Sequence, residues 1–585
     1  MPDDAKQPDR SNIAVWGSDV IASAIREQGF PYVCLNPGAS YRGLHDSLVN
    51  YLGNAEPEML VCLHEEHAVA MAQGYAMVTD EPLAVIVHSN VGLMHATMGV
   101  FDAWCKRVPV VMFGATGPVD AMQRRPWIDW IHTTADQGAQ IRDYTKWDDQ
   151  PGSAEAAVES VRRATSIATT RPFGPVYVNF DAAVQEMELD EWPELYDIAK
   201  FRPPAPPAPS SGDMEQLLAI LKDASSPLIL AGRSSADEGD WARRIDLAER
   251  LGAGVITGLG GAAFPTTHPL YIGETNFVVR PDLIDDFRSA DMVLALDWVD
   301  LGGTLRQAYP VGGAMPKIVN VSVDYQVHRG WSMDYQAMPP VDLHIATTPE
   351  PVVEALLNEL PKSKKKFART PPQLPDKPEG SGSISVSALA AMFLNVTKEQ
   401  PVSILSRPIG WPPEAGTIEH PEDYVGGNGG GGVGAGPGIA VGAALALRDR
   451  NSPRIPVAVV GDGDYTMSSN ALWTAAANDI PLLVIVANNR AYFNDELHQQ
   501  RVAKARDRDQ ANAWVGQRID DPPPDLAMIA RGHGLGGEGP VADLAELEAA
   551  LGRALDAVRA GQPYVLDVIV EREYVSKRLD AKRKK

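Results

Sequence analysis

Short runs of consecutive apolar residues alternate with segments of helical periodicity along most of the chain. The first helical segment is predicted over residues 19–28 and is stopped by Gly29. The apolar runs predict strands over residues 32–35, 60–63, 83–87, 108–113 and 176–179, then 228–231, 255–257, 292–296 and 318–323, and finally 402–405, 457–460, 482–487 and 564–570. Continuous apolar strands that alternate with helices are typical of parallel sheets with both faces covered.

Two stretches rich in proline or charge interrupt this alternation, at residues 202–211 and 361–383. Neither can form a packed helix or a central strand, so both are predicted to be linkers. At 585 residues the chain also exceeds what one hydrophobic core usually serves. The sequence therefore predicts an α/β protein with three doubly wound parallel-sheet domains in series, over residues 11–200, 212–360 and 384–575.

Composition limits the kinds of binding partner and cellular compartment that are expected. A formal net charge of −24, with no long basic stretch interleaved with aromatics, argues against nucleic acid. The three cysteines, Cys34, Cys62 and Cys105, lack the C-x-x-C spacing, which is expected of a reducing compartment without disulfides or zinc. The N-terminus is polar and no run approaches about 18 apolar residues, so we expect no membrane span and a cytoplasmic protein.

The most informative stretch covers residues 455–494, in which Gly461-Asp462-Gly463 and Asn488-Asn489 each follow a predicted strand. A helix is predicted between them over roughly residues 468–478. Because a strand-helix-strand unit returns the chain to the same sheet edge, Asp462 and Asn489 are expected to meet there. Carboxylate, amide and backbone oxygens suit Mg²⁺, and the flanking glycines let the backbone approach a phosphate. The alternative is that both motifs are ordinary turns after strands.

This pattern resembles the thiamine diphosphate signature, in which GDG is followed after a fixed interval by NN. The resemblance implies that Asp462, the Asn489 side chain and the Ala491 carbonyl hold Mg²⁺. It also implies diphosphate contacts from the segment around the metal, namely Gly461, Gly463, Asp464, Tyr465 and Asn489. Asp464 stands where the family usually has a small residue, and an extra carboxylate there is unexplained unless it turns toward a cation or the metal's water.

A second motif, HEEHAVAMAQGYA at residues 64–76, resembles the catalytic glutamate segment of the decarboxylase and acetolactate synthase superfamily. A thiazolium C2–H is too weak an acid to ionise unaided, so Glu65 is expected to hydrogen-bond the aminopyrimidine ring and let the cofactor act as its own base. Two other interpretations remain. Glu65 also suits a helix start, where acidic residues favour the macrodipole. HEEH also suggests zinc, although H-x-x-H is not the i, i+4 pair of a metalloprotease.

Further positions follow from the same resemblance, which covers essentially the whole chain and looks nearest to benzoylformate decarboxylase. Pro37 and Gly38 are expected beside the cofactor, and Val433, inside the glycine run 426–438, is expected to wedge between its two rings. His88 matches an active-site histidine, although a single histidine after a strand is more often structural.

The chain also departs from the pattern. Ala39 followed by Ser40 replaces a serine that meets substrate, and the sequence does not place the family's second catalytic histidine in the middle domain. Candidate substrate contacts are residues 124–132, with two arginines and two tryptophans, and residues 492–494. Surface ion pairing and core packing explain these segments equally well.

The resemblance implies a thiamine diphosphate- and Mg²⁺-dependent lyase or carboligase that acts on a 2-oxo acid. The first alternative is an acetolactate synthase-like carboligase, whose relatives bind FAD in the middle domain; no complete G-x-G-x-x-G fingerprint supports FAD here. The others are a non-catalytic cofactor-binding protein and a nucleotide-dependent oxidoreductase. Active sites between subunits, in a homodimer or homotetramer, are also implied.

Overall fold

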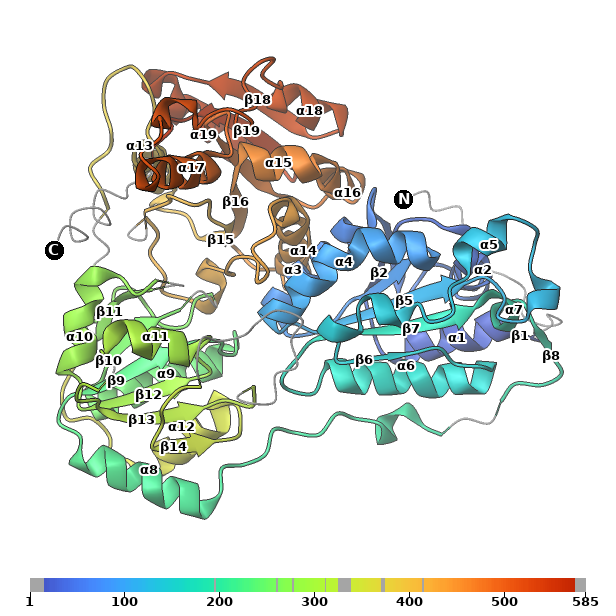
Figure 1. Cartoon of the computed structure of the whole chain (residues 1–585), viewed down its shortest axis with the longest axis horizontal. Helices are drawn as coiled ribbons and strands as arrows, with labels where there is room; N and C mark the ends of the chain where they lie inside the picture. The colour runs from blue at the N-terminus through green and yellow to red at the C-terminus, as the bar shows by residue number, and fades with distance from the viewer. Residues whose placement is uncertain are drawn as a thin grey trace.

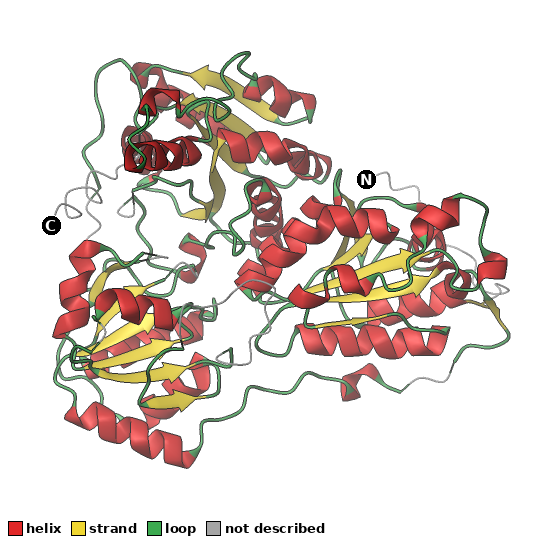
Figure 2. Cartoon of the chain, in the orientation of Figure 1, coloured by secondary structure: helices red, strands yellow, loops and turns green. Residues whose placement is uncertain are grey.

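A computed structural model describes residues 15–193, 196–258, 261–275, 278–310, 312–324, 338–369, 374–412 and 415–573. The ends of the predicted outer domains, residues 11–14 and 574–575, lie outside these ranges. Three parallel sheets, one per predicted domain, follow one another along the chain (Figure 1). Helices cover both faces of the sheets (Figure 2), so the predicted fold class is confirmed.

The N-terminal domain is built on a six-stranded parallel sheet of order β3-β2-β4-β5-β7-β6, beside a two-stranded antiparallel ribbon of β1 and β8. Its strands are β1 (Val15–Trp16), β2 (Tyr32–Leu35), β3 (Glu58–Val61), β4 (Ala84–Val87), β5 (Val110–Thr116), β6 (Trp147–Asp149), β7 (Pro175–Asp181) and β8 (Glu188–Leu189). Its helices are α1 (Gly17–Glu27), α2 (Arg42–Asp46), α3 (Glu65–Thr79), α4 (Ser89–Lys106), α5 (Ile128–His132), α6 (Ala154–Ala168) and α7 (Ala182–Gln185).

The central domain has a six-stranded parallel sheet of order β11-β10-β9-β12-β13-β14. The predicted linker at 202–211 runs in an extended path from the N-terminal domain to the first central helix (Figure 1). The elements are α8 (Ser211–Asp223), β9 (Pro227–Ala231), α9 (Glu238–Leu251), β10 (Gly254–Thr257), β11 (Tyr271–Glu274), α10 (Ile284–Ser289), β12 (Met292–Leu296), α11 (Leu301–Ala308), β13 (Lys317–Val321), β14 (Leu343–Ile345) and α12 (Pro349–Glu359).

The C-terminal domain has a five-stranded parallel sheet of order β15-β16-β17-β19-β18. Its elements are α13 (Val386–Thr397), β15 (Val402–Ser406), α14 (Ala435–Asp449), β16 (Ile455–Gly461), α15 (Asp462–Ser468), α16 (Leu472–Ala477), β17 (Leu483–Asn488), α17 (Phe493–Ala505), α18 (Leu526–Gly532), β18 (Gly536–Val541), α19 (Leu544–Arg559) and β19 (Tyr564–Ile569). In the described part of the chain, every helix is too short or too polar to cross a bilayer.

Each predicted strand coincides with an observed one, with ends displaced by a few residues. The helix predicted over residues 468–478 is wrong at its start, because α15 begins at Asp462 directly after β16 and a 3₁₀ turn separates it from α16. Six strands were not predicted: β1 and β8 of the two-stranded ribbon, and β6, β11, β14 and β18 of the parallel sheets. All six are short or polar, and the four in the parallel sheets lie at sheet edges, where the apolar signal is weakest.

Helices α3 and α14 join the N-terminal domain to the C-terminal domain and lie side by side at the centre of the molecule (Figure 1). Glycines permit this contact. A Cβ added at Gly74 would come 2.0 Å from the Ile439 carbonyl oxygen, and one at Gly442 would come 1.9 Å from the Met71 carbonyl oxygen. Backbone therefore packs directly against backbone, and any side chain at these positions would separate the helices.

We expect Gly442→Ala to destabilise the protein, although alanine is the better helix former. The added methyl must push against the Met71 backbone, an overpacking effect of about 1–3 kcal/mol that outweighs a helix-propensity gain of about 1 kcal/mol. Gly552→Ala is the matched control, since Gly552 lies inside α19 with open space around its Cβ position. In urea or thermal unfolding, the free energy of unfolding should fall for Gly442→Ala and rise for Gly552→Ala. A stabilised Gly442→Ala protein would contradict the packing argument.

Candidate active site

The predicted metal ligands converge at the carboxyl ends of β16 and β17, which are neighbours in the C-terminal sheet. The Ala491 N–H lies 3.0 Å from both Asp462 Oδ2 and Asn489 Oδ1, to which it donates. Asp462 stands at the first residue of α15, so the free N–H groups of that helix face the same point. All three residues assigned to Mg²⁺ from the sequence are thus brought together, although Ala491 makes these contacts through its N–H and not through its carbonyl.

A cavity of about 360 Å³ opens beside these residues. Its lining includes most of the predicted cofactor positions, namely Val433, Gly461, Asp462, Gly463, Asp464, Asn489 and Ala491. Val433 is 49% exposed, which is high for a valine next to a cavity. All the described residues that line this cavity belong to the C-terminal domain.

The extra carboxylate of Asp464 has a partner that the sequence did not suggest. Asp464 Oδ1 accepts the N–H of Gly434 at 2.6 Å and that of Gly436 at 3.4 Å. A Cβ added at Gly436 would come 2.2 Å from Asp464 Oδ2, so glycine is needed there. These hydrogen bonds therefore connect the glycine run 426–438 to the first turn of α15, which also carries Asp462. Burial raises the pKa of the Asp464 carboxyl to about 6, against the lowering effect of these two N–H donors.

Tyr465, predicted to contact the cofactor, points into the core. Its side chain is fully buried and its hydroxyl donates to the Leu526 carbonyl at 3.1 Å. The side chain therefore points away from the cavity, contrary to a side-chain contact with the cofactor, and a contact through the Tyr465 backbone stays a prediction. At Gly463 an added Cβ would come 2.6 Å from the ring of Tyr492, which explains the glycine.

The residues present fit a divalent cation with a diphosphate. The donor set consists of hard oxygens, and burial raises the pKa of the Asp462 carboxyl to about 6 although backbone N–H groups lower it. A buried carboxylate of this kind is stabilised by a cation beside it. In the central sheet, between the ends of β9 and β12, Arg233 pairs with Asp297 and Asp324 at 3.0 and 2.8 Å. Doubly wound sheets bind ligands at such an edge, and FAD binding there stays without support from the described residues.

Glu65 is the first residue of α3 and is 6% exposed. Its Oε2 accepts from His95 Nδ1 at 3.0 Å, and a Cβ added at Gly92 would come 3.1 Å from Oε1. Helix α4 thus holds this carboxylate from two positions. The helix-start interpretation also applies, because His64 caps α3 by accepting the Glu66 N–H at 3.2 Å. A carboxylate that only favoured the helix dipole would need no partner in a second helix.

His64, Glu65 and His95 each offer one ligand atom, and these atoms lie within 4.8 Å of one another. This is the structural counterpart of the zinc interpretation of HEEH, but with His95 in place of His67. Both outer rings already use Nδ1, since His64 Nδ1 accepts the Glu66 N–H and His95 Nδ1 donates to Glu65. A metal would therefore have to take Nε2 of each ring or displace these hydrogen bonds.

His88 lies at the end of β4 and contacts the turn that carries Gly38. A Cβ at Gly38 would come 2.2 Å from His88 Cβ, so this position must be glycine. Ala39 stands at the position of the family's serine, and Ser40 follows it. The Ser40 hydroxyl forms a hydrogen bond with His88 Nδ1 at 2.9 Å, so a serine still contacts the histidine ring. Burial is the main cause that lowers the pKa of His88, followed by His132, while Glu65 raises it.

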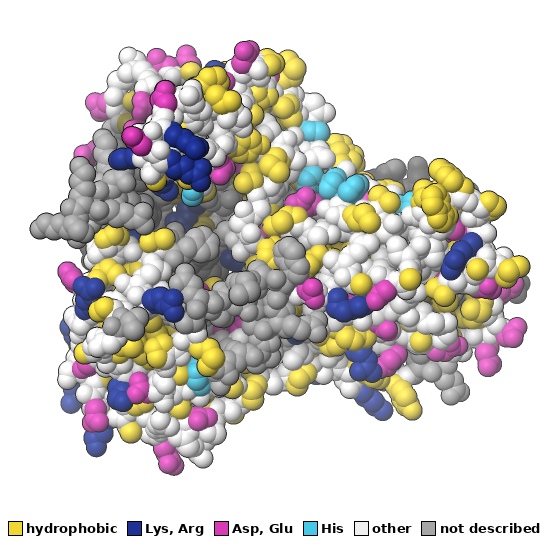
Figure 3. Space-filling view, viewed as in Figure 1, with side chains coloured by type: hydrophobic (Ala, Val, Ile, Leu, Met, Phe, Trp, Pro, Cys, Tyr) yellow, Lys and Arg dark blue, Asp and Glu magenta, His cyan; other side chains and the backbone are white. Residues whose placement is uncertain are grey.

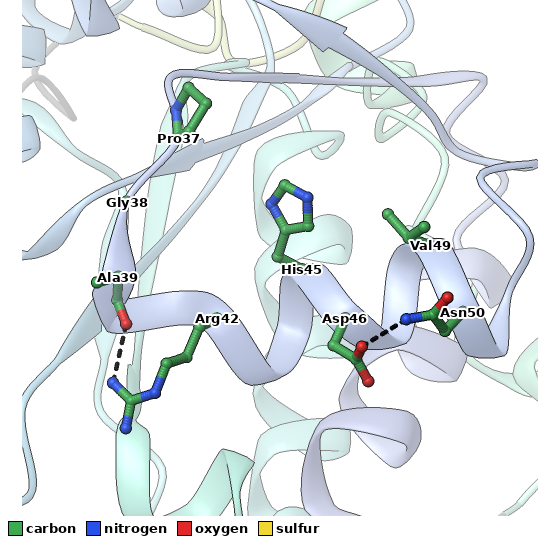
Figure 4. A pocket seen from close by; sticks show the side chains of 8 residues that line it. All are labelled: Pro37, Gly38, Ala39, Arg42, His45, Asp46, Val49 and Asn50. Atoms are coloured by element: carbon green, nitrogen blue, oxygen red, sulfur yellow. Dashed lines mark hydrogen bonds between the residues drawn. The ribbon is translucent and has the colours of Figure 1, made fainter. Parts of the chain in front are cut away.

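An open pocket lies beside Pro37 and Gly38 (Figure 4). In it Arg42 donates to the Ala39 carbonyl at 3.0 Å and Asn50 donates to the Asp46 carboxylate at 2.6 Å. Neither Glu65 nor His88 lines this pocket, so it is separate from the histidine-rich side of the turn. Contact of Pro37 and Gly38 with the cofactor stays a prediction.

Sequence reasoning missed His95, named Ser40 only as a departure from the family pattern, and treated His132 only as part of the candidate substrate segment 124–132. His95 lies seven residues after His88, about two helical turns along α4, and that spacing is a signal for a shared face. Figure 3 shows histidine side chains gathered over α4, where the N-terminal domain faces the C-terminal domain. The ring of His132 lies 4.8 Å from that of His88.

Comparison with known proteins identifies the family of this chain. Residues 15–140 match the model described as thiamine pyrophosphate enzyme, N-terminal TPP binding domain; residues 214–356 match the central domain, and residues 411–568 match the C-terminal TPP binding domain. Thiamine pyrophosphate is another name for thiamine diphosphate. The three matches lie one in each sheet-containing domain, in the expected order.

Individual proteins are similar at low identity. Acetolactate synthase 1 of Nicotiana tabacum is 23% identical, over 95% of this chain and 81% of its own length. The benzoylformate decarboxylase structure from Polynucleobacter necessarius superposes with a TM-score of 0.77 at 19% identity, covering 96% and 99% of the two chains. The thiamine diphosphate-dependent 4-hydroxybenzoylformate decarboxylase of Rhodococcus jostii gives 0.74 at 22%, covering 95% and 99%. With all three domain models matched in order, the chain belongs to the thiamine diphosphate-dependent decarboxylase and acetolactate synthase superfamily.

Proposed function

We propose that this chain is an Mg²⁺-dependent enzyme that decarboxylates a 2-oxo acid with bound thiamine diphosphate. The observation that carries the proposal is the meeting of Asp462, Asn489 and Ala491 at one cavity, in a chain that also holds a buried carboxylate at Glu65. A protein that only bound the cofactor would need the first feature but not the second. The printed names of the relatives, two decarboxylases and a synthase, agree with this class of reaction.

The C-terminal domain supplies the holding groups. Asp462, the Asn489 side chain and the Ala491 carbonyl would coordinate Mg²⁺, and the free N–H groups at the start of α15 would bind the diphosphate. Val433, half-exposed at the cavity, would press between the two rings of the cofactor. Asp464 accepts hydrogen bonds from the N–H groups of Gly434 and Gly436, and these bonds fix the backbone beside this valine.

The N-terminal domain supplies the groups that handle protons. When bound, thiamine diphosphate provides an acidic thiazolium C–H and an electron sink for the bond next to the ketone. Glu65 would share a proton with the pyrimidine ring, and His95 fixes the carboxylate by donating to Oε2. His88, with its Nδ1 bonded to Ser40, leaves Nε2 free for a substrate oxygen.

We also propose that a second copy of the chain completes each site. The cavity lining lacks N-terminal-domain residues within the described ranges, whereas Glu65 and His88 belong to that domain. A dimer that places the N-terminal domain of one copy over the cavity of the other would unite the two halves. A homodimer is then the smallest active form, and a homotetramer contains two such pairs.

The test is reconstitution. The protein is stripped of metal and cofactor, Mg²⁺ and thiamine diphosphate are restored separately and together, and carbon dioxide release is measured from pyruvate, benzoylformate and glyoxylate. The proposal expects release only when both are present. Formation of a hydroxyketone or acetohydroxy acid instead of an aldehyde would favour the carboligase alternative. Absence of cofactor binding by calorimetry would refute the proposal, and binding without turnover on a broad acid panel would favour the non-catalytic alternative.

A further inference from the structure

Two histidines from separate elements of the N-terminal domain face each other. His88 follows β4, and His132 is the last residue of α5, within the segment 124–132. Their ring centroids lie 4.8 Å apart with an interplanar angle of 48°. Both side chains are half-buried. His88 directly precedes α4, whose His95 donates to Glu65, so the pair and that carboxylate are connected through one helix.

The hydrogen bonds around His88 fix which nitrogen carries the proton in its neutral form. The Ser89 N–H donates to Ser40 Oγ at 3.1 Å, so the Ser40 hydroxyl is left to donate to His88 Nδ1 at 2.9 Å. The Ser40 backbone N–H points at the same nitrogen at 3.3 Å. Nδ1 is therefore an acceptor, and neutral His88 presents an Nε2–H donor.

His132 has the opposite arrangement. Its Nδ1 lies 3.0 Å from the Ile128 carbonyl, which can only accept, so Nδ1 carries the proton and neutral His132 presents a basic Nε2. The backbone on both sides of the ring is held as well. Asn90, at the start of α4, donates to the Ile131 carbonyl at 3.1 Å, and the Gly117 N–H donates to the His132 carbonyl at 3.2 Å. The ring is thus fixed against α4 and β5.

We propose that His132 is the second catalytic histidine of this site, with His88 as hydrogen-bond donor to a substrate oxygen and His132 as proton carrier. One nitrogen that gives a hydrogen bond and one that takes a proton, fixed in adjacent rings, match what decarboxylation requires. The inference rests on the proposed function.

The carboxylate of the 2-oxo acid leaves as carbon dioxide, and the electron pair of the broken C–C bond stays with the former carbonyl carbon. That carbon takes one proton from the Nε2–H of protonated His132, and the product is an aldehyde. His132 regains a proton from solvent, so each turnover consumes one proton. If an aldehyde acceptor is present, its carbonyl carbon competes with His132 for the same electron pair and a hydroxyketone forms instead.

The test compares His132→Asn with His344→Asn, a substitution in the central domain. We expect His132→Asn to lower kcat for aldehyde formation at least about a hundredfold, with a smaller effect on KM. With an added aldehyde acceptor, its products should shift from aldehyde toward hydroxyketone, an effect that simple loss of folded protein cannot give. Calorimetric affinities for Mg²⁺ and thiamine diphosphate should stay unchanged. His132→Gln repeats the test if the asparagine variant folds poorly.

A cofactor-free measurement is independent of turnover. The charged groups that face His88 are His132, from α5, and Glu65, from α3; protonated His132 lowers the pKa of His88. NMR titration of isotope-labelled histidine should therefore show a higher pKa for His88 in His132→Asn than in the wild type. An unchanged pKa of His88 in His132→Asn would overturn the inference. A wild-type rate and product ratio in that variant would overturn it as well. Wild-type protein that binds cofactor but releases no carbon dioxide would instead overturn the proposed function, and this role with it.

Discussion

Replacing Glu65 with glutamine is expected to lower carbon dioxide release by on the order of a thousandfold. Glutamine has nearly the shape of glutamate and can still accept from His95, but it cannot share a proton with the cofactor. Cofactor binding should survive, because Glu65 does not line the cavity proposed to hold Mg²⁺ and the diphosphate. The measurement is steady-state release at saturating cofactor, together with calorimetric cofactor affinity.

Glu66→Gln is the control for this experiment. Glu66 is the adjacent carboxylate in the first turn of α3, so it contributes similarly to the helix dipole. Its side chain is half-buried and its pKa is raised, mainly by burial and then by Asp102. The control should keep most of the activity. Equal losses in both variants would mean that the carboxylates act on the helix rather than on the cofactor.

Asp462→Asn is expected to abolish Mg²⁺ binding at micromolar to millimolar metal and, with it, turnover. Asparagine retains an oxygen but removes the negative charge that draws the cation into a buried site. Low pH should imitate the substitution. Burial raises the pKa of Asp462 to about 6 in the metal-free protein, so above pH 6 the carboxylate is charged and binds. Below that value a proton competes with the metal, and affinity should fall about tenfold for each further pH unit.

Asp464→Asn separates this effect from general loss of buried charge. Burial raises the pKa of Asp464 to about 6 as well, but its carboxylate accepts N–H groups of the glycine run. Isothermal titration with Mg²⁺ between pH 5 and pH 8 should show a steep pH dependence for the wild type and for Asp464→Asn. Measurable binding by Asp462→Asn, or a flat profile for the wild type, would contradict the assignment of Asp462 as a ligand.

The parts of this fold that the sequence predicts are those with a strong apolar signal. Strands such as β12 and β17 are buried on both faces, so their residues form unbroken apolar runs. By contrast β18, with the sequence GGEGPV, pairs through its backbone and carries almost no apolar signal. The start of α15 was misplaced because glycine and aspartate suggest a loop, whereas here they form the first turn of a helix.

The contacts of the candidate site also fall into those that the sequence predicts and those that it does not. Asp462 and Asn489 could be brought together from topology alone, because parallel strands end at one edge. The contact of His95 with Glu65 joins side chains 30 positions apart on two helices, and that of Asp464 with Gly434 again spans 30 positions. Such contacts depend on rotamers and on the path of a glycine-rich loop, which neither periodicity nor spacing determines.

The bond between Asp464 and the glycine run would make the two proposed ligands of the cavity, Mg²⁺ and thiamine diphosphate, thermodynamically dependent on each other. Asp462, the proposed metal ligand, and Asp464, which holds the backbone next to Val433, share the first turn of one helix. A cation that orders this turn also orders the wall against which the organic cofactor rests, so part of the ordering entropy is lost only once. The resulting cooperativity is reciprocal: whatever factor Mg²⁺ adds to the affinity for thiamine diphosphate, thiamine diphosphate adds to the affinity for Mg²⁺.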